Sequence, residues 1–164
     1  LPTRAYLGYR YENGWLSLYG VGPEGTVPVQ AVAPGQVYRA EGLSEGSLAV
    51  IHEDPLNPGE KVILYFTEMR SSRGGEALIS DAIPLGTIEL SVEAGDTIGY
   101  QGMWAGSAYR QDWLHVTLGI APFDPDFLGD SELLAENLID PSEYFGIKLD
   151  PDDGHLRPLV CAEK

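Results

Sequence analysis

The residue of this chain most suited to chemistry is His115, which lies in the stretch QDWLHVTLG at residues 111–119. Apolar side chains alternate along this stretch, as they do in a β-strand with one buried face. In such a strand His115 shares its face with Trp113 and Thr117, and the leucines and valine between them point to the other face. Imidazole is both a common metal ligand and a common base. His115 is therefore a candidate metal ligand, a candidate catalytic base, or the remnant of one.

The other reactive side chains have less suitable surroundings. His52 ends the apolar stretch LAVIH, where we expect a surface or capping role. His155 belongs to the turn DPDDGH at 150–155, which lacks the full donor set of a calcium loop, so we expect it to be solvated. Cys161 is the only cysteine, which excludes an internal disulfide and a cysteine-based zinc site. No base stands near it in the sequence to activate the thiol.

Short strands must position these residues, because 20 Gly and 12 Pro suit a chain of many turns. Only the region after residue 130 predicts helices, one at 131–137 and a short turn at 140–145. We expect an all-β domain of mainly antiparallel sheets, a sandwich or a partly closed barrel, with one or two short C-terminal helices. A single domain should span 1–164, with a core at roughly 15–146 and a polar, peripheral tail at 147–164. The expected strands are 4–11, 15–21, 26–33, 36–40, 48–52, 61–67, 86–92, 96–101 and 111–119.

The charge balance excludes several classes of partner. With 25 acidic and 10 basic residues the net charge is −15, which argues against binding to nucleic acid or to anionic membranes. No apolar run is long enough to insert into a membrane. The chain begins at Leu1 and Pro2, and we expect that a signal peptide or an anchor has been removed, which would place the protein outside the cytoplasm, in the periplasm, at the cell surface or secreted.

Six phrases of the sequence, in this order, belong together: GTVPVQAVAPGQV (25–37), LAVIHED (48–54), VILYFT (62–67), VEAGDTIGYQG (92–102), WLHVTLG (113–119) and IDPSEYF (139–145). In their order and spacing they resemble the lysostaphin-like M23 zinc peptidases. The resemblance covers roughly residues 15–146 and implies a mostly antiparallel β domain with a groove that holds zinc. In that family the ligands come from a His-x-x-x-Asp phrase and from the second His of a His-x-His phrase, and zinc-bound water cleaves peptidoglycan cross-bridges.

The same resemblance places unsuitable residues at the metal-binding positions. The His-x-x-x-Asp positions fall on Trp15 and Tyr19, a histidine of the preceding strand falls on Thr67, and the His-x-His positions fall on Trp113 and His115. A tryptophan has no lone pair to offer a metal, and a catalytic zinc needs about three protein ligands. These five residues are thus expected to form a degenerate groove used for binding or packing.

We expect a catalytically inactive M23-like domain without a metal or cofactor. It would act as a binding or scaffold module in the cell envelope or a surface assembly, with a protein or a cell-wall component as its partner. The resemblance leaves open an altered zinc metallopeptidase that uses His115. A carbohydrate-binding or peptidoglycan-binding module using Trp15 and Trp113 also stays open, as does a structural subunit that packs through its N-terminal tyrosines. The sequence does not indicate an oligomeric state.

Overall fold

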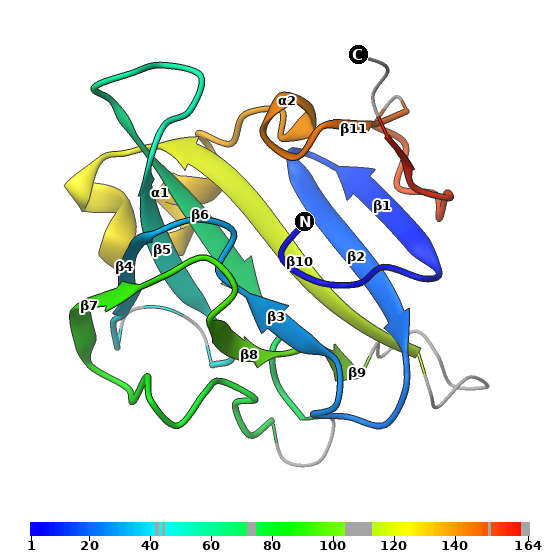
Figure 1. Ribbon diagram of the computed structural model, residues 1–164, viewed down its shortest axis with the longest axis horizontal. Helices are drawn as coiled ribbons and strands as arrows, with labels where there is room; N and C mark the ends of the chain where they lie inside the picture. Colours follow the sequence, from blue (N-terminus) through cyan, green and yellow to red (C-terminus); the bar gives the residue numbers. More distant parts are fainter. Residues whose placement is uncertain (42, 44, 72–74, 104–112, 151, 162–164) are drawn as a thin grey trace.

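The structure is a computed structural model that describes residues 1–164 except 42, 44, 72–74, 104–112, 151 and 162–164. Antiparallel strands dominate, so the expected all-β class with short C-terminal helices is confirmed (Figure 1). The strands are β1 (Gly8–Glu12), β2 (Trp15–Val21), β3 (Pro28–Gln30), β4 (Gly35–Arg39), β5 (Leu48–Glu53), β6 (Lys61–Thr67), β7 (Thr87–Val92), β8 (Thr97–Tyr100), β9 (Gly102–Met103), β10 (Trp113–Pro122), β11 (Ile147–Lys148) and β12 (Val160–Cys161). The helices are the 3-10 helix η1 (Pro125–Gly129), α1 (Ser131–Ala135) and α2 (Ser142–Phe145).

One large antiparallel sheet organises the molecule. Its strand order is β1-β2-β10-β6-β5-β4-β7, and β9 pairs with β10 at residues 114–115, before the β6 ladder begins at Thr117. Strands distant in the sequence are therefore neighbours: β2 and β10 pair in register, with Leu16 opposite Leu118. Two small sheets, β3-β8 and β11-β12, complete the fold.

The inner face of the main sheet carries the larger apolar core. Leu16 and Leu18 of β2 and Val116 of β10 are fully buried there, as the period-two alternation predicts. Val29 of β3 and Ile98 of β8 belong to the same cluster, so the small β3-β8 sheet covers this face. Figure 1 shows the two short strands in front of the main sheet.

Among the described residues, the helices η1 and α1 cover one end of the outer face. Residues of β5 and β6 that alternate with the inner core, such as Ile51 and Tyr65, form a second cluster with Phe127 of η1 and Leu134 of α1. Asp130 caps α1 by accepting a hydrogen bond from the Leu133 amide at 3.0 Å. Beyond these helices the outer face of β1, β2 and β10 carries a groove, and at its far end Tyr19 and His115 are buried, with 3% and 8% exposure.

Several expected elements differ in length from those observed. The segment 26–33 contributes only β3, because the register with β8 shifts between Val29 and Gln30. The segment 4–11 joins the sheet only at Gly8, whose φ of 114° departs from the strand conformation. The strand that carries His115 continues to Pro122, and the segment 125–129, not predicted to be helical, forms η1.

The C-terminal tail lies along the edge of the main sheet, and most of its described side chains are exposed. It runs along β1, where the Tyr9 amide donates to the Arg157 carbonyl at 2.8 Å and the Arg157 amide donates back at 2.9 Å. The Tyr9 hydroxyl accepts a hydrogen bond from the Asp150 amide at 2.8 Å. The polar composition of the tail hid these contacts, because main-chain pairing along a sheet edge leaves no side-chain pattern.

His52 is also buried, where we expected a surface or capping role. Its side chain is 4% exposed, and Nδ1 lies 3.0 Å from the carbonyl oxygen of Pro34. Because a carbonyl only accepts, Nδ1 carries the hydrogen. Burial lowers the pKa of His52, and the Pro34 hydrogen bond opposes that shift. His155, in contrast, is exposed as expected.

Candidate functional site: a groove on the outer face of the main sheet

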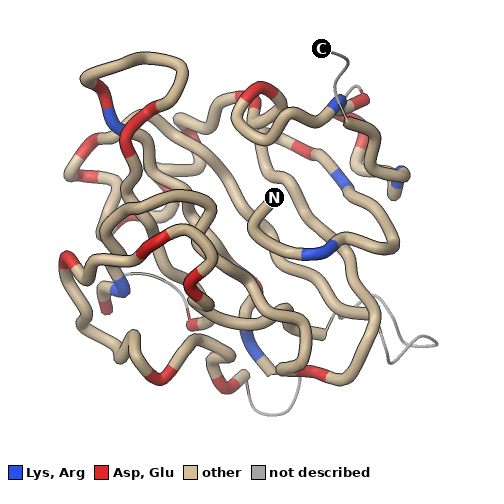
Figure 2. The backbone as a smooth tube through the Cα atoms, in the orientation of Figure 1, with Lys and Arg blue, Asp and Glu red and all other residues tan. Residues whose placement is uncertain are grey.

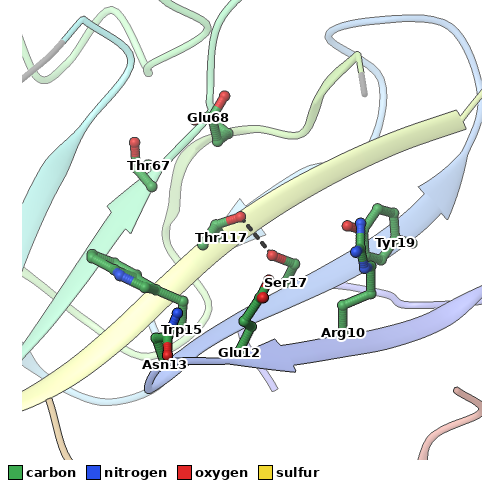
Figure 3. A pocket seen from close by; sticks show the side chains of 9 residues that line it. All are labelled: Arg10, Glu12, Asn13, Trp15, Ser17, Tyr19, Thr67, Glu68 and Thr117. Atoms are coloured by element: carbon green, nitrogen blue, oxygen red, sulfur yellow. Dashed lines mark hydrogen bonds between the residues drawn. The ribbon is translucent and has the colours of Figure 1, made fainter. Parts of the chain in front are cut away.

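A groove of about 340 Å³ occupies the open part of the outer face (Figure 3). Its floor comes from β2, β10 and the end of β6, and β1 supplies one wall. The lining residues are Arg10, Glu12, Asn13, Trp15, Ser17, Tyr19, Thr67, Glu68 and Thr117.

A row of hydroxyl groups crosses the floor from strand to strand. Ser17, Thr117 and Thr67 stand opposite one another in register on β2, β10 and β6. The Ser17 and Thr117 hydroxyls are 2.7 Å apart and hydrogen-bonded, as the dashed line in Figure 3 marks. Thr67 accepts a hydrogen bond from the Ser47 hydroxyl at 2.9 Å. The strand backbones are about 4.8 Å apart, and the side chains lean together so that the hydroxyls of each bonded pair are within hydrogen-bond distance.

Trp15 forms the aromatic end of the groove. Its ring meets Tyr65 edge to face, with centroids 5.8 Å apart, which anchors it to the outer-face cluster. Gly119 leaves the space that the indole fills, because a Cβ there would lie 3.2 Å from Trp15 Cε3. The indole remains half-buried and lines the groove, so it both packs and offers a surface.

Tyr19 and His115 form a stacked pair at the other end. The residues are opposite each other on β2 and β10, and their rings lie 5.6 Å apart at 13°. Tyr19 lines the groove, whereas His115 lies beside it and is 8% exposed. Burial lowers the pKa of His115, although the Glu68 carboxylate and the Gly102 backbone oppose the shift. The ring is therefore neutral near pH 7, and none of the described residues bonds to its Nδ1.

Glu68 stands on the rim in a strained conformation. Its φ is 70°, which few residues other than glycine adopt, and its carboxylate lies 3.6 Å from the Arg70 guanidinium. The main chain there is packed closely against Gly102, which has no room for a side chain. Such strain persists only where the surroundings impose it, and it is frequent at binding sites.

The wall from β1 is held by the C-terminal tail. Arg10 Nε donates to the Gly154 carbonyl, and the Glu12 carboxylate lies against Gly154. The backbone N–H of Asn13 donates to the Asp152 carboxylate at 2.6 Å. The tail therefore positions three residues of the groove wall at once.

The five residues predicted for the site have different placements. Trp15, Tyr19 and Thr67 line the groove, and His115 stacks against Tyr19. Trp113 lies at the start of β10 opposite Val21 and does not line it.

Six lining residues were not among the residues predicted for the site. Ser17 and Thr117 could have been predicted from the sequence. Ser17 lies on the same strand face as Trp15 and Tyr19, and Thr117 lies on the same strand face as His115. Arg10, Glu12 and Asn13 depend on the pairing of β1 with β2, and Glu68 on the turn after β6.

The residues of the groove do not suit a catalytic zinc. In the part of the chain that the structure describes, no three His, Cys, Asp or Glu side chains are grouped so that they could hold a metal ion. At the positions that the sequence resemblance gives to ligands, only His115 has a side-chain nitrogen that can coordinate. No helix of the described residues is long and apolar enough to cross a membrane.

No protein-family model matches the sequence, and no curated protein matches it. Among solved structures, the chain is similar to the catalytic domain of the antimicrobial peptidase lysostaphin from Staphylococcus simulans. The two share 16% identity over 84% of this chain and 87% of that chain, with a TM-score of 0.47. Lysostaphin as a longer chain matches at 16% identity, over 88% of this chain and 57% of that one, with a TM-score of 0.48. A putative glycyl-glycine endopeptidase lytM from Ruminococcus gnavus matches at 16% identity over 75% and 55% of the two chains, with a TM-score of 0.40. These are structural similarities at low sequence identity.

Proposed function

We propose that this domain is an M23-peptidase-like module that binds a cell-wall component in the groove and does not hydrolyse it. Its setting would be outside the cytoplasm, as a scaffold in the cell envelope or in a surface assembly. The observation that carries the proposal is the makeup of the groove, in which Trp15, Tyr19 and Thr67 occupy positions that the sequence resemblance gives to metal-binding and catalytic side chains.

The chemistry of these residues supports binding over catalysis. Activation of water by zinc requires ligands with lone pairs and an open coordination position, and an indole supplies neither. An aromatic ring beside ordered hydroxyls suits recognition, because the ring offers apolar area and the hydroxyls fix orientation. Trp15 and the hydroxyls of Ser17 and Thr117 provide both on one sheet face.

The experiment is a pull-down of the purified protein on insoluble peptidoglycan. Trp15→Ala and Thr117→Val should release it, since the first removes the aromatic surface and the second replaces a groove hydroxyl by a methyl group. Tyr6→Ala is the matched control, because Tyr6 is an aromatic residue 74% exposed that does not line the groove. Equal retention of all four proteins, or no retention of the wild type, would contradict the proposal.

The second candidate function is an altered metallopeptidase. The observation that favours it is the buried, neutral His115 with the Glu68 carboxylate close enough to affect its pKa. Metal analysis of the purified protein decides between the two: stoichiometric zinc that is lost in His115→Ala, together with release of peptide fragments from peptidoglycan, would favour the peptidase.

A further inference from the structure

The groove floor is the face of a sheet whose strands already have their neighbours. In the floor, β2 pairs with β1 and β10, and β10 pairs with β2 and β6. An extended peptide gains affinity by adding main-chain hydrogen bonds to a free strand edge. Among the described residues the floor strands offer no such edge, so a ligand on the floor meets side chains.

The side chains on the groove floor suit a sugar ring, which bears many hydroxyl groups. Ser17 and Thr117 together have two hydroxyl hydrogens and four lone pairs, and their mutual bond uses one of each. One donor and three acceptor positions of the pair therefore remain. Beside them the half-buried indole of Trp15 provides an apolar surface for the C–H face of a sugar ring. Asn13 and Arg10 on the rim add further donors.

The charges around the groove disfavour an anionic ligand. Among the described residues that line the groove, Glu12 and Glu68 are acidic and Arg10 is basic, and the Arg70 guanidinium lies 3.6 Å from the Glu68 carboxylate. The whole chain has a net charge of −15, and Figure 2 shows acidic residues spread over the molecule. This field repels carboxylate or phosphate groups and leaves a neutral molecule unaffected. A groove of about 340 Å³ is of the size used for small-molecule ligands.

We propose that the groove binds a neutral oligosaccharide, with one sugar ring against Trp15 and its hydroxyls on the Ser17–Thr117 pair. The inference rests on the proposed binding function and names the chemical class of its ligand. Within a cell-wall component, it assigns the glycan chain to the groove and leaves the peptides outside it.

The test is isothermal titration of the protein with chitotriose and cellotriose, which are neutral, and with trigalacturonic acid, which is anionic. The neutral sugars should bind, and the anionic sugar should bind more weakly at low salt, with the difference shrinking as salt is added. Thr117→Val should weaken binding of the neutral sugars about fivefold, the effect of one lost hydrogen bond. Trp15→Ala should weaken it further, and Tyr6→Ala should match the wild type.

Two results would overturn the inference. Peptidoglycan binding that is competed by free stem peptides and not by the neutral sugars would remove the saccharide assignment and leave the proposed binding function standing. Sugar binding that is unchanged in Thr117→Val, a nearly isosteric variant whose fold is checked by circular dichroism, would place the sugar elsewhere. If the wild type does not bind peptidoglycan at all, that result would instead count against the proposed function itself.

Discussion

Mild acid should destabilise this protein through its two buried histidines. His52 and His115 are 4% and 8% exposed, and burial lowers the pKa of each below its ordinary value. The unfolded chain has its histidine pKa near 6.5, so as the pH falls the unfolded state takes up protons first. The contribution of the two neutral histidines to the free energy of unfolding is therefore fully present above about pH 6.5. It is lost as the pH falls toward the pKa values of the folded state.

The size of the effect follows from this linkage. For a folded ring that stays fully neutral, the loss of stability is RT ln(1 + 10^(6.5 − pH)), so about 1.4 kcal/mol is the upper limit for one histidine at pH 5.5. The upper limit for the two histidines together is about 2.8 kcal/mol, compared with the roughly 5–15 kcal/mol that stabilises a typical domain. The Arg157 hydrogen bond lowers the pKa of Asp153 to about 2, so this carboxylate stays ionised throughout the window.

Urea unfolding at pH 7.5, 6.5 and 5.5 would measure the effect. His52→Asn does not titrate, and its amide can take the place of Nδ1 in the bond to the Pro34 carbonyl. Each of His52→Asn and His115→Asn should reduce the pH-dependent loss, by at most about 1.4 kcal/mol at pH 5.5, and the double variant should remove the histidine contribution. His155→Gln, at an exposed position, is the control. A wild type equally stable at pH 7.5 and 5.5, or a double variant that keeps the full loss, would refute the reasoning.

Three further changes test the packing around the groove. Gly119→Ala should cost about 1 kcal/mol, because its Cβ would lie 2.5 Å from Leu138 Cδ2 and 3.2 Å from the Trp15 ring, and a shift in tryptophan fluorescence should accompany the loss. Leu134→Ala, at a fully buried position of α1, should cost about 2–5 kcal/mol in urea unfolding; a cost under 1 kcal/mol would mean that α1 does not pack as described. Deletion of residues 150–164 should accelerate hydrogen exchange at the Tyr9 amide, which then loses its Arg157 acceptor, and unchanged exchange would contradict the pairing.

The alternation along two segments was enough to predict part of the site. Trp15 and Tyr19, and separately His115 and Thr117, fall on one face of their strands because side chains repeat every two residues. The register that puts His115 opposite Tyr19 had no local signal, since it depends on two strands about a hundred residues apart.

The β1 wall was equally out of reach from the sequence. Arg10 and Glu12 become part of the groove only when β1 pairs with β2 and the tail returns to residue 154. Main-chain hydrogen bonds of this kind do not depend on residue type. The polar composition of the tail therefore predicted a peripheral segment. His52 was misjudged for a related reason: its neighbour is a carbonyl from another segment, which no spacing in LAVIH reveals.

The hydroxyl pair at the centre of the groove can form only late in the synthesis of the chain. Ser17 and Thr117 are 100 residues apart, and β10, which supplies one of them, ends at Pro122. During translation β2 therefore cannot pair with β10 until most of the chain has been made. Contacts between residues so far apart in the sequence also form slowly. A nascent chain that stops short of β10 has no groove, so ligand binding would report that synthesis had passed this strand and that the sheet had closed around it.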